Sequence, residues 1–217
     1  MARAARNNNT PLTVGIGASA GGVEALQSFF RAMPPDSGLA FIVVLHIGHG
    51  HHSALPEILA RCTPMPVAAA RDGDAIEAGH VYVLAADSVL TVGRHKLRLR
   101  PNPDLSRERH TIDVFLASLA EDFGENAIAV ILSGIGNDGT LGARAIKEKG
   151  GLTLAQAPDH GVPRHPQMPA SAIAAGAIDL EIPVGAMGAK LLEYAQGLGR
   201  LATDGQPRAR LSVGGEA

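Results

Sequence analysis

The chain has 217 residues, of which 46% are hydrophobic and 18% charged, so it can form one large globular domain with a sizeable core. A net charge of −2 and a pI near 6.5 give no reason to expect nucleic acid or a membrane surface as partner. One cysteine excludes an intrachain disulfide framework, and no signal pattern or membrane-length apolar run appears, so we expect a cytoplasmic protein without membrane insertion.

Continuously apolar strands alternate with segments of helical spacing along most of the chain. The first predicted elements are a strand at Leu12–Gly17, a helix at Gly22–Ala32, a strand at Ala40–His46 and a helix near 54–61 capped by Ser53. The later ones are a helix at Ile112–Phe123, a strand at Ala127–Gly134, a helix at Thr140–Lys149, a strand at Leu152–Gln156 and a helix at 185–197.

Three other segments differ from this alternation. His80–Leu99 has short alternating strands and turn residues, which predict an antiparallel hairpin element. Residues 158–169 are rich in proline and histidine and predict a loop. We expect a disordered lead-in at 1–10, a folded domain at 11–197 and a flexible tail at 198–217. The fold class is therefore α/β, with a doubly wound, mostly parallel sheet, helices on both faces and a small antiparallel hairpin.

One reactive side chain follows each of three buried strands. Ser19 follows the first, His46 ends the second, and Asp138 lies in the turn after the third. Sites in doubly wound sheets gather beyond the carboxyl ends of the strands. A serine becomes a nucleophile when a histidine takes its proton and a carboxylate orients that histidine. Gly17–Gly21 also matches the Gly-x-Ser-x-Gly turn that presents a nucleophilic serine.

A dinucleotide-binding interpretation competes with this one. Gly15–Ala20 matches Gly-x-Gly-x-x-Ala, and Gly134–Gly139 is a literal Gly-x-Gly-x-x-Gly between a strand and a helix. Such a site needs an acidic residue at the end of the next strand. This chain has His46 at the first such position and Gln156 at the second, with Asp159 three residues further on in a proline-rich loop. A nucleotide-binding module without hydrolase activity therefore stays open as the alternative.

Simpler roles are open for several of these residues. Ser19 could cap the helix that follows it, and Asn137–Gly139 could be a plain turn. His46, His49, His51 and His52 are crowded together, but their spacing fits no zinc pattern, so no metal or other cofactor is expected. Cys62 is expected to be a small core residue.

Several segments, taken in order, resemble the catalytic domain of the CheB-type chemotaxis protein-glutamate methylesterases. They are VGIGASAGGVEAL, IVVLHIGHGHHSALPEILA, GHVYVLA, ILSGIGNDGTLGARAIKEKGG and MPASAI. The resemblance runs from about Leu12 to Tyr194 and implies a catalytic triad of Ser19, His46 and Asp138. It implies hydrolysis of glutamyl methyl esters on chemoreceptor helices or a related methylated signalling protein, with glutamine deamidation as a related activity. Backbone N–H groups of Ala20 and Ile135 would then hold the oxyanion.

Three features depart from the family pattern. Ile135 stands where relatives commonly have methionine, and Gln167–Ala170 replaces a Gly-Met-Pro-Arg stretch. Many relatives also carry an N-terminal receiver domain, for which we find no segment in this sequence. We therefore expect activity without phosphorylation of the chain itself.

Overall fold

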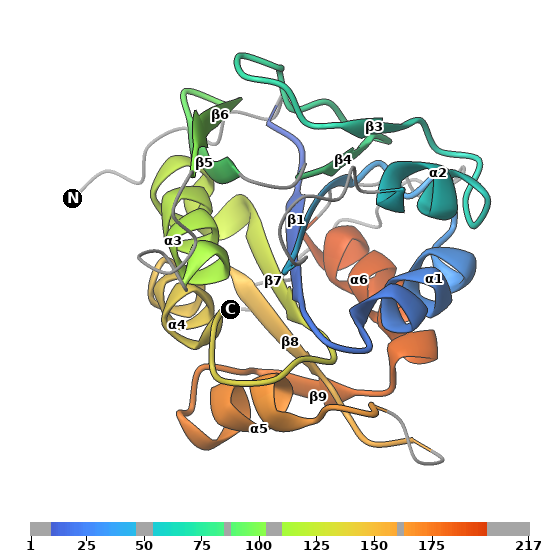
Figure 1. Ribbon diagram of the computed structural model, residues 1–217, viewed down its shortest axis with the longest axis vertical. Coiled ribbons are helices and arrows are strands. Elements are labelled where there is room, and N and C mark those ends of the chain that lie inside the picture. Colours follow the sequence, from blue (N-terminus) through green and yellow to red (C-terminus); the bar gives the residue numbers. More distant parts are fainter. Residues whose placement is uncertain (1–9, 47–53, 85–87, 103–109, 160–162, 199–217) are drawn as a thin grey trace, which may run out of the picture.

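The computed structural model describes residues 10–46, 54–84, 88–102, 110–159 and 163–198. Seven parallel strands form one sheet in the order β3-β4-β2-β1-β7-β8-β9 (Figure 1). Their bounds are β1 Thr13–Ala18, β2 Ala40–Leu45, β3 Val67–Ala69, β4 Val81–Val83, β7 Ala127–Ile131, β8 Leu152–Gln156 and β9 Leu180–Ile182. The expected lead-in, the tail and the cap Ser53 fall wholly or almost wholly outside the described residues.

Helices cover both faces of the sheet, with α1 and α6 on one side and α3 and α4 on the other (Figure 1). Their bounds are α1 Gly22–Ala32, α2 Leu55–Ala60, α3 Thr111–Phe123, α4 Thr140–Glu148, α5 Gln167–Ala174 and α6 Val184–Gly197, with a short 3-10 helix at Gly124–Asn126. A two-stranded antiparallel hairpin, β5 Ser88–Gly93 and β6 Lys96–Pro101, packs with α3. The doubly wound α/β prediction is confirmed.

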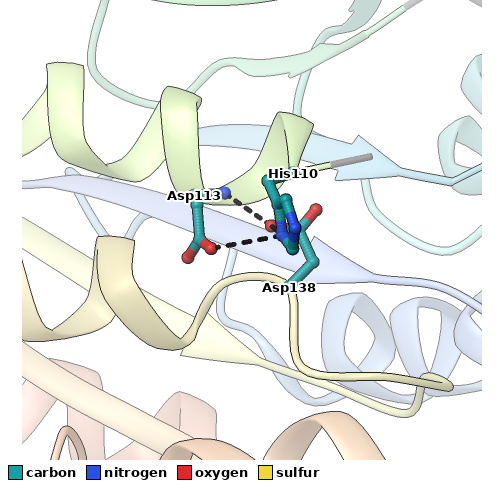
Figure 2. A group of neighbouring side chains, drawn as sticks. All are labelled: His110, Asp113 and Asp138. Atoms are coloured by element: carbon teal, nitrogen blue, oxygen red, sulfur yellow. Dashed lines mark hydrogen bonds and ion pairs between the residues drawn. The ribbon is translucent and has the colours of Figure 1, made fainter. Parts of the chain in front are cut away.

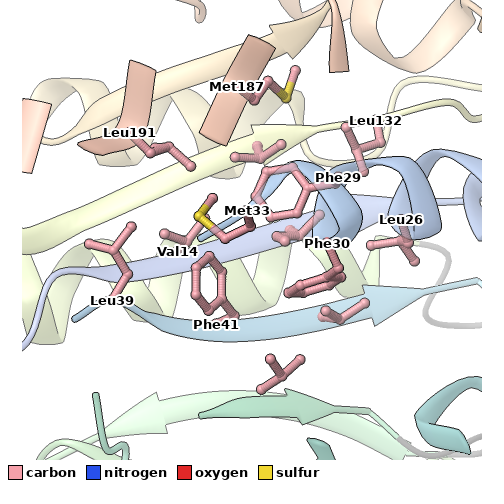
Figure 3. Packing of buried hydrophobic residues seen from close by; sticks show 14 of the residues in the cluster. Val14, Leu26, Phe29, Phe30, Met33, Leu39, Phe41, Leu132, Met187 and Leu191 are labelled. Carbon is pink, nitrogen blue, oxygen red and sulfur yellow. The ribbon is translucent and has the colours of Figure 1, made fainter. Parts of the chain in front are cut away.

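The two faces of β1 bury different cores. Val14 and Ile16 point to the α1 and α6 side, where Phe29, Phe30 and Phe41 pack edge to face (Figure 3). The alternate positions are glycines because α3 lies directly on that side of the strand. A β-carbon on Gly15 would come within 2.6 Å of Leu116, and one on Gly17 would overlap Ile112. These glycines therefore allow helix-to-sheet contact.

The structure corrects three details of the sequence prediction. Val81–Val83 joins the main parallel sheet, so only the later part of His80–Leu99 is antiparallel. The segment 158–169 is not all loop, because α5 begins at Gln167. Cys62 is half-buried at the edge of the α1-side core, where its thiol donates to the Ile58 carbonyl. Among the described residues, no helix is long and apolar enough to cross a membrane.

Candidate active site

The register of the sheet brings the first two candidate residues to one edge. Ala18 pairs with Leu45 across β1 and β2, so Ser19 and His46 are the next residues on adjacent strands. The His46 N–H continues the ladder by donating to the Ala18 carbonyl at 3.1 Å. On the other side of β1, the Ser19 N–H donates to the Ser133 carbonyl at 2.9 Å. Ser19, His46 and the end of β7 therefore lie together at the carboxyl edge of the sheet.

Asp138 pairs with His46 at this edge. The His46 Nε2 atom lies 2.8 Å from Asp138 Oδ2, although 92 positions separate the residues along the sequence. The side chain of Asp138 is 5% exposed and that of His46 is 31% exposed, so the carboxylate is buried while the imidazole reaches solvent. A carboxylate in this position fixes the proton on Nε2 and leaves Nδ1 as the basic nitrogen of the neutral ring.

The first turn of α3 and the start of α4 hold the Asp138 carboxylate. Oδ2 accepts the Ile112 N–H at 3.0 Å, and Oδ1 accepts the Asp113 and Gly139 N–H groups at 2.9 and 2.8 Å. The first N–H groups of a helix have no partner within that helix and favour negative charge. The carboxylate therefore satisfies the helix terminus, and the helix terminus fixes the orientation of the carboxylate.

Ser19 lies on a tight turn between β1 and α1. Its carbonyl accepts the Gly22 N–H at 2.8 Å, and Gly21 between them has φ +70°, a left-handed conformation that favours glycine. A β-carbon on Gly134 would come within 3.0 Å of the Ser19 β-carbon, so the loop after β7 lies directly against the serine. This is the compact strand-turn-helix geometry that the Gly-x-Ser-x-Gly spacing predicts.

Two backbone N–H groups next to Ser19 are available for an anion. Within the described residues, neither the Ala20 N–H nor the Ile135 N–H donates a hydrogen bond, whereas neighbouring amides do. Ala20 directly follows Ser19 in the sequence. Ile135 directly follows Gly134, and Gly134 lies against Ser19. The Ile135 side chain is 55% exposed, so its backbone lies near the protein surface.

Ser133 and Gln156 connect the serine turn to the rest of the sheet edge. The Ser133 hydroxyl donates to the Ala20 carbonyl at 2.9 Å, and the Ser133 N–H donates to Gln156 Oε1 at 2.9 Å. Sequence reasoning considered Gln156 only as the position of a missing ribose-binding acid and did not identify Ser133. The structure shows both as supports of the Ser19 turn.

The unusual stretch Gln167–Ala170 packs against the same loop. Gln167 Oε1 accepts the Gly136 N–H at 3.3 Å, and the Met168 N–H donates to the Gly134 carbonyl at 3.0 Å. Met168 is fully buried, and a β-carbon on Gly134 would overlap its sulfur. This departure from the family pattern therefore contacts the loop between Ser19 and Asp138.

The glycines that suggested a nucleotide site are filled by protein side chains. Ile112 occupies the space beside Gly17 and approaches Gly139, and Met168 occupies the space beside Gly134. In a dinucleotide site, the equivalent glycines allow the backbone to approach a pyrophosphate. Packing explains these glycines here, and this counts against the nucleotide-binding alternative.

His110, Asp113 and Asp138 form a second cluster of ionisable groups beside the site (Figure 2). The His110 Nδ1 atom lies 3.7 Å from Asp113 Oδ2 and 3.9 Å from Asp138 Oδ1. One ligand atom from each residue lies within 4.8 Å of the others, which is close enough for a metal. Backbone N–H groups already donate to both carboxylates, so hydrogen bonds account for the arrangement without a cation.

Asp113 gives a pH-dependent stability prediction. Burial raises the pKa of its carboxyl above the ordinary value of 3.8, the hydrogen bond from Gly142 lowers it, and the charge of Asp138 raises it. The folded protein therefore holds this proton more tightly than the unfolded chain, and stability is lost as pH rises from 3.8 through the raised pKa. The Asp113→Asn variant lacks this titrating carboxyl. The difference between its Tm and the wild-type Tm should therefore increase by a few degrees as the pH rises from 3.8 through the raised pKa. Calorimetry at several pH values checks this, and a pH-independent difference would contradict it.

The chain is similar to one family of known proteins over most of its length. A family model described as CheB methylesterase matches residues 14–191. The protein-glutamate methylesterase/protein-glutamine glutaminase 3 of Burkholderia orbicola is 36% identical over 183 residues, which are 84% of this chain and 53% of the relative. A protein-glutamate methylesterase/protein-glutamine glutaminase of Mesorhizobium japonicum is 35% identical over 89% of this chain and 56% of its own length. This chain thus spans about half the length of these curated relatives.

A solved structure supports the same relationship. The crystal structure of the Thermotoga maritima CheB methylesterase catalytic domain superposes with a TM-score of 0.75 at 29% sequence identity. The match covers 85% of this chain and 98% of the solved one.

Proposed function

The chain belongs to the CheB methylesterase family, and we propose on this basis that it is a serine hydrolase acting on glutamyl methyl esters. The observation that carries the proposal is the 2.8 Å distance between His46 Nε2 and Asp138 Oδ2, at the sheet edge where Ser19 and His46 follow adjacent strands. Relatives are named as both protein-glutamate methylesterase and protein-glutamine glutaminase. We therefore include deamidation of glutamine side chains as a second reaction of the same site.

In the first half-reaction, Ser19 is the nucleophile and His46 is the general base. Asp138 holds the proton on His46 Nε2, so Nδ1 takes the proton from the Ser19 hydroxyl as its oxygen attacks the ester carbonyl. The carbonyl oxygen becomes an oxyanion, which the Ala20 and Ile135 N–H groups stabilise. As this intermediate collapses, the bond to the methoxy group breaks, and the protonated His46 donates its proton to the methoxy oxygen, which leaves as methanol.

The second half-reaction restores the enzyme. Water attacks the acyl-Ser19 ester while His46 Nδ1 accepts its proton, and the oxyanion again lies between the two N–H groups. Collapse releases a glutamate carboxylic acid and returns the proton to Ser19. With a glutamine substrate the leaving group is ammonia in place of methanol. No step requires a metal or an organic cofactor.

The proposed substrates are methylated chemoreceptor cytoplasmic helices or a related methylated signalling protein. This partner class follows from the family and from the names of the relatives. A net charge of −2 supports a protein partner over a nucleic acid. We place the reaction in the cytoplasm because the single cysteine fits a reducing compartment.

Methanol release tests this function against the nucleotide-binding alternative. The purified protein should release labelled methanol from a receptor preparation methylated with labelled methyl groups, and calorimetric titration with NAD should show no saturable binding. The matched control is the same receptor preparation without the protein. Micromolar binding of NAD together with background methanol release would reject the hydrolase and favour the nucleotide-binding module.

A further inference from the structure

We propose that Thr111 is a positioning residue for the general base His46. The inference rests on the proposed function, because it assigns a role relative to the proposed triad. Thr111 is the first residue of α3 and belongs to none of the sequence motifs that indicated the site. Its hydroxyl oxygen lies 3.2 Å from His46 Nε2, across 65 positions of sequence.

The Thr111 hydroxyl and the Asp138 carboxylate approach the same nitrogen. Asp138 Oδ2 is 2.8 Å from Nε2 and Thr111 Oγ1 is 3.2 Å from it, so the Nε2–H lies between two oxygen acceptors from separate elements. Thr111 is 8% exposed, and the hydroxyl is therefore largely shielded from water that could compete for this contact. Both oxygens can accept a hydrogen bond from the same Nε2–H.

The hydroxyl is not used to cap the helix. The N-cap position of α3 is His110, which makes no side-chain cap hydrogen bond, and Thr111 is already inside the helix. Asp138 takes the N–H groups of the next two residues, Ile112 and Asp113. One turn of backbone therefore fixes both the carboxylate and the hydroxyl that face the imidazole.

Two hydrogen-bond acceptors restrict the rotation of the His46 ring more than a single acceptor would. The backbone of His46 is fixed by its bond to Ala18, but its side chain can still rotate about two bonds, and the ring is 31% exposed. Contacts to Asp138 and Thr111 together hold Nε2 in place, which leaves Nδ1 as the nitrogen that accepts the Ser19 proton in the proposed mechanism. Nε2 keeps its proton through both half-reactions, and the contact strengthens when the ring becomes a cation. Thr111 thus acts through His46 and does not touch the substrate.

The test compares Thr111→Val, which removes the hydroxyl at nearly constant shape, with Thr111→Ser, which keeps it. We expect Thr111→Val to lower kcat for methanol release on the order of 10-fold, with KM unchanged. Labelling of the protein by a serine-directed fluorophosphonate should slow in parallel, because it needs the same base. Thr111→Ser should restore both rates to near the wild-type values. Thr111→Ala serves the same purpose if the valine variant fails to fold.

Two results would overturn the role of Thr111 while leaving the proposed function intact. One is an unchanged kcat in Thr111→Val, and the other is an equal loss in Thr111→Val and Thr111→Ser, since packing would then explain the effect. Ser19→Ala, measured beside them, should be inactive in either case. Activity in Ser19→Ala would instead reject the proposed function and the inference that rests on it.

Discussion

Replacement of Ser19 by alanine should lower the rate of methanol release by roughly 10³-fold or more. Alanine keeps the β-carbon that lies against Gly134 and keeps the backbone bonds to Ser133 and Gly22, but it removes the attacking oxygen. The turn should therefore stay folded, and Tm should remain within a few degrees of wild type. The loss should appear in kcat, with substrate affinity largely retained.

Ser28→Ala is the matched control for this variant. Ser28 lies on the exposed side of α1, where its hydroxyl donates a hydrogen bond to the Glu24 carbonyl one turn earlier. Its loss should leave methanol release at the wild-type rate. If Ser19→Ala kept a normal rate under the same conditions, Ser19 would not be the nucleophile.

Loss of either member of the His46–Asp138 pair should lower the rate by several orders of magnitude. His46→Ala removes the base, whereas Asp138→Asn keeps one acceptor oxygen for the N–H groups of α3 but cannot hold the proton on Nε2 in the same way. Triad residues act as a unit, so the double variant should be little slower than the worse single variant. The measurement is a double-mutant cycle on kcat/KM for methanol release.

The pair His80 and Glu77 provides the control cycle. The His80 Nε2 and Glu77 Oε2 atoms are 4.0 Å apart on the exposed surface, so His80→Ala and Glu77→Gln should each leave the rate near wild type. Multiplicative losses from His46→Ala and Asp138→Asn would show that these residues act independently and would contradict a triad.

The sheet could be predicted because its strands are continuously apolar. Ala40–Leu45 and Ala127–Ile131 contain only apolar residues, and this pattern predicts strands buried on both faces. The short strand Val67–Ala69 has no such signal, because three residues at a sheet edge carry too little periodicity. The alternation in Val81–Val83 resembles that of the neighbouring antiparallel strands and predicts a hairpin strand, whereas its partner β2 is distant in sequence.

The candidate reactive residues could be identified from the sequence, but the residues that contact and support them could not. Ser19, His46 and Asp138 each follow a recognisable strand, so their positions follow from the general geometry of parallel sheets. The Thr111 and Ser133 hydroxyls make contacts across 65 and 113 positions of the sequence, and no spacing rule predicts either contact. Their roles depend on side-chain direction after folding, which strand and helix patterns do not specify.

The glycine patterns are also insufficient to identify the site. Gly15 and Gly17 match a pyrophosphate-binding pattern, yet the space beside them is filled by Leu116 and Ile112 of α3. A glycine in sequence indicates close approach but does not identify what approaches. The identity of the neighbour came only from the packed structure.

Reaction of the wild-type protein with a fluorophosphonate, followed by peptide mass spectrometry, tests the role of Ser19 most directly. One equivalent of label should attach to the peptide that contains Ser19, and methanol release should fall in proportion to the labelled fraction. Labelling should be strongly reduced in His46→Ala, because the serine then lacks its base. Label on a different residue, or complete labelling of Ser19 with methanol release undiminished, would contradict a Ser19-dependent methylesterase.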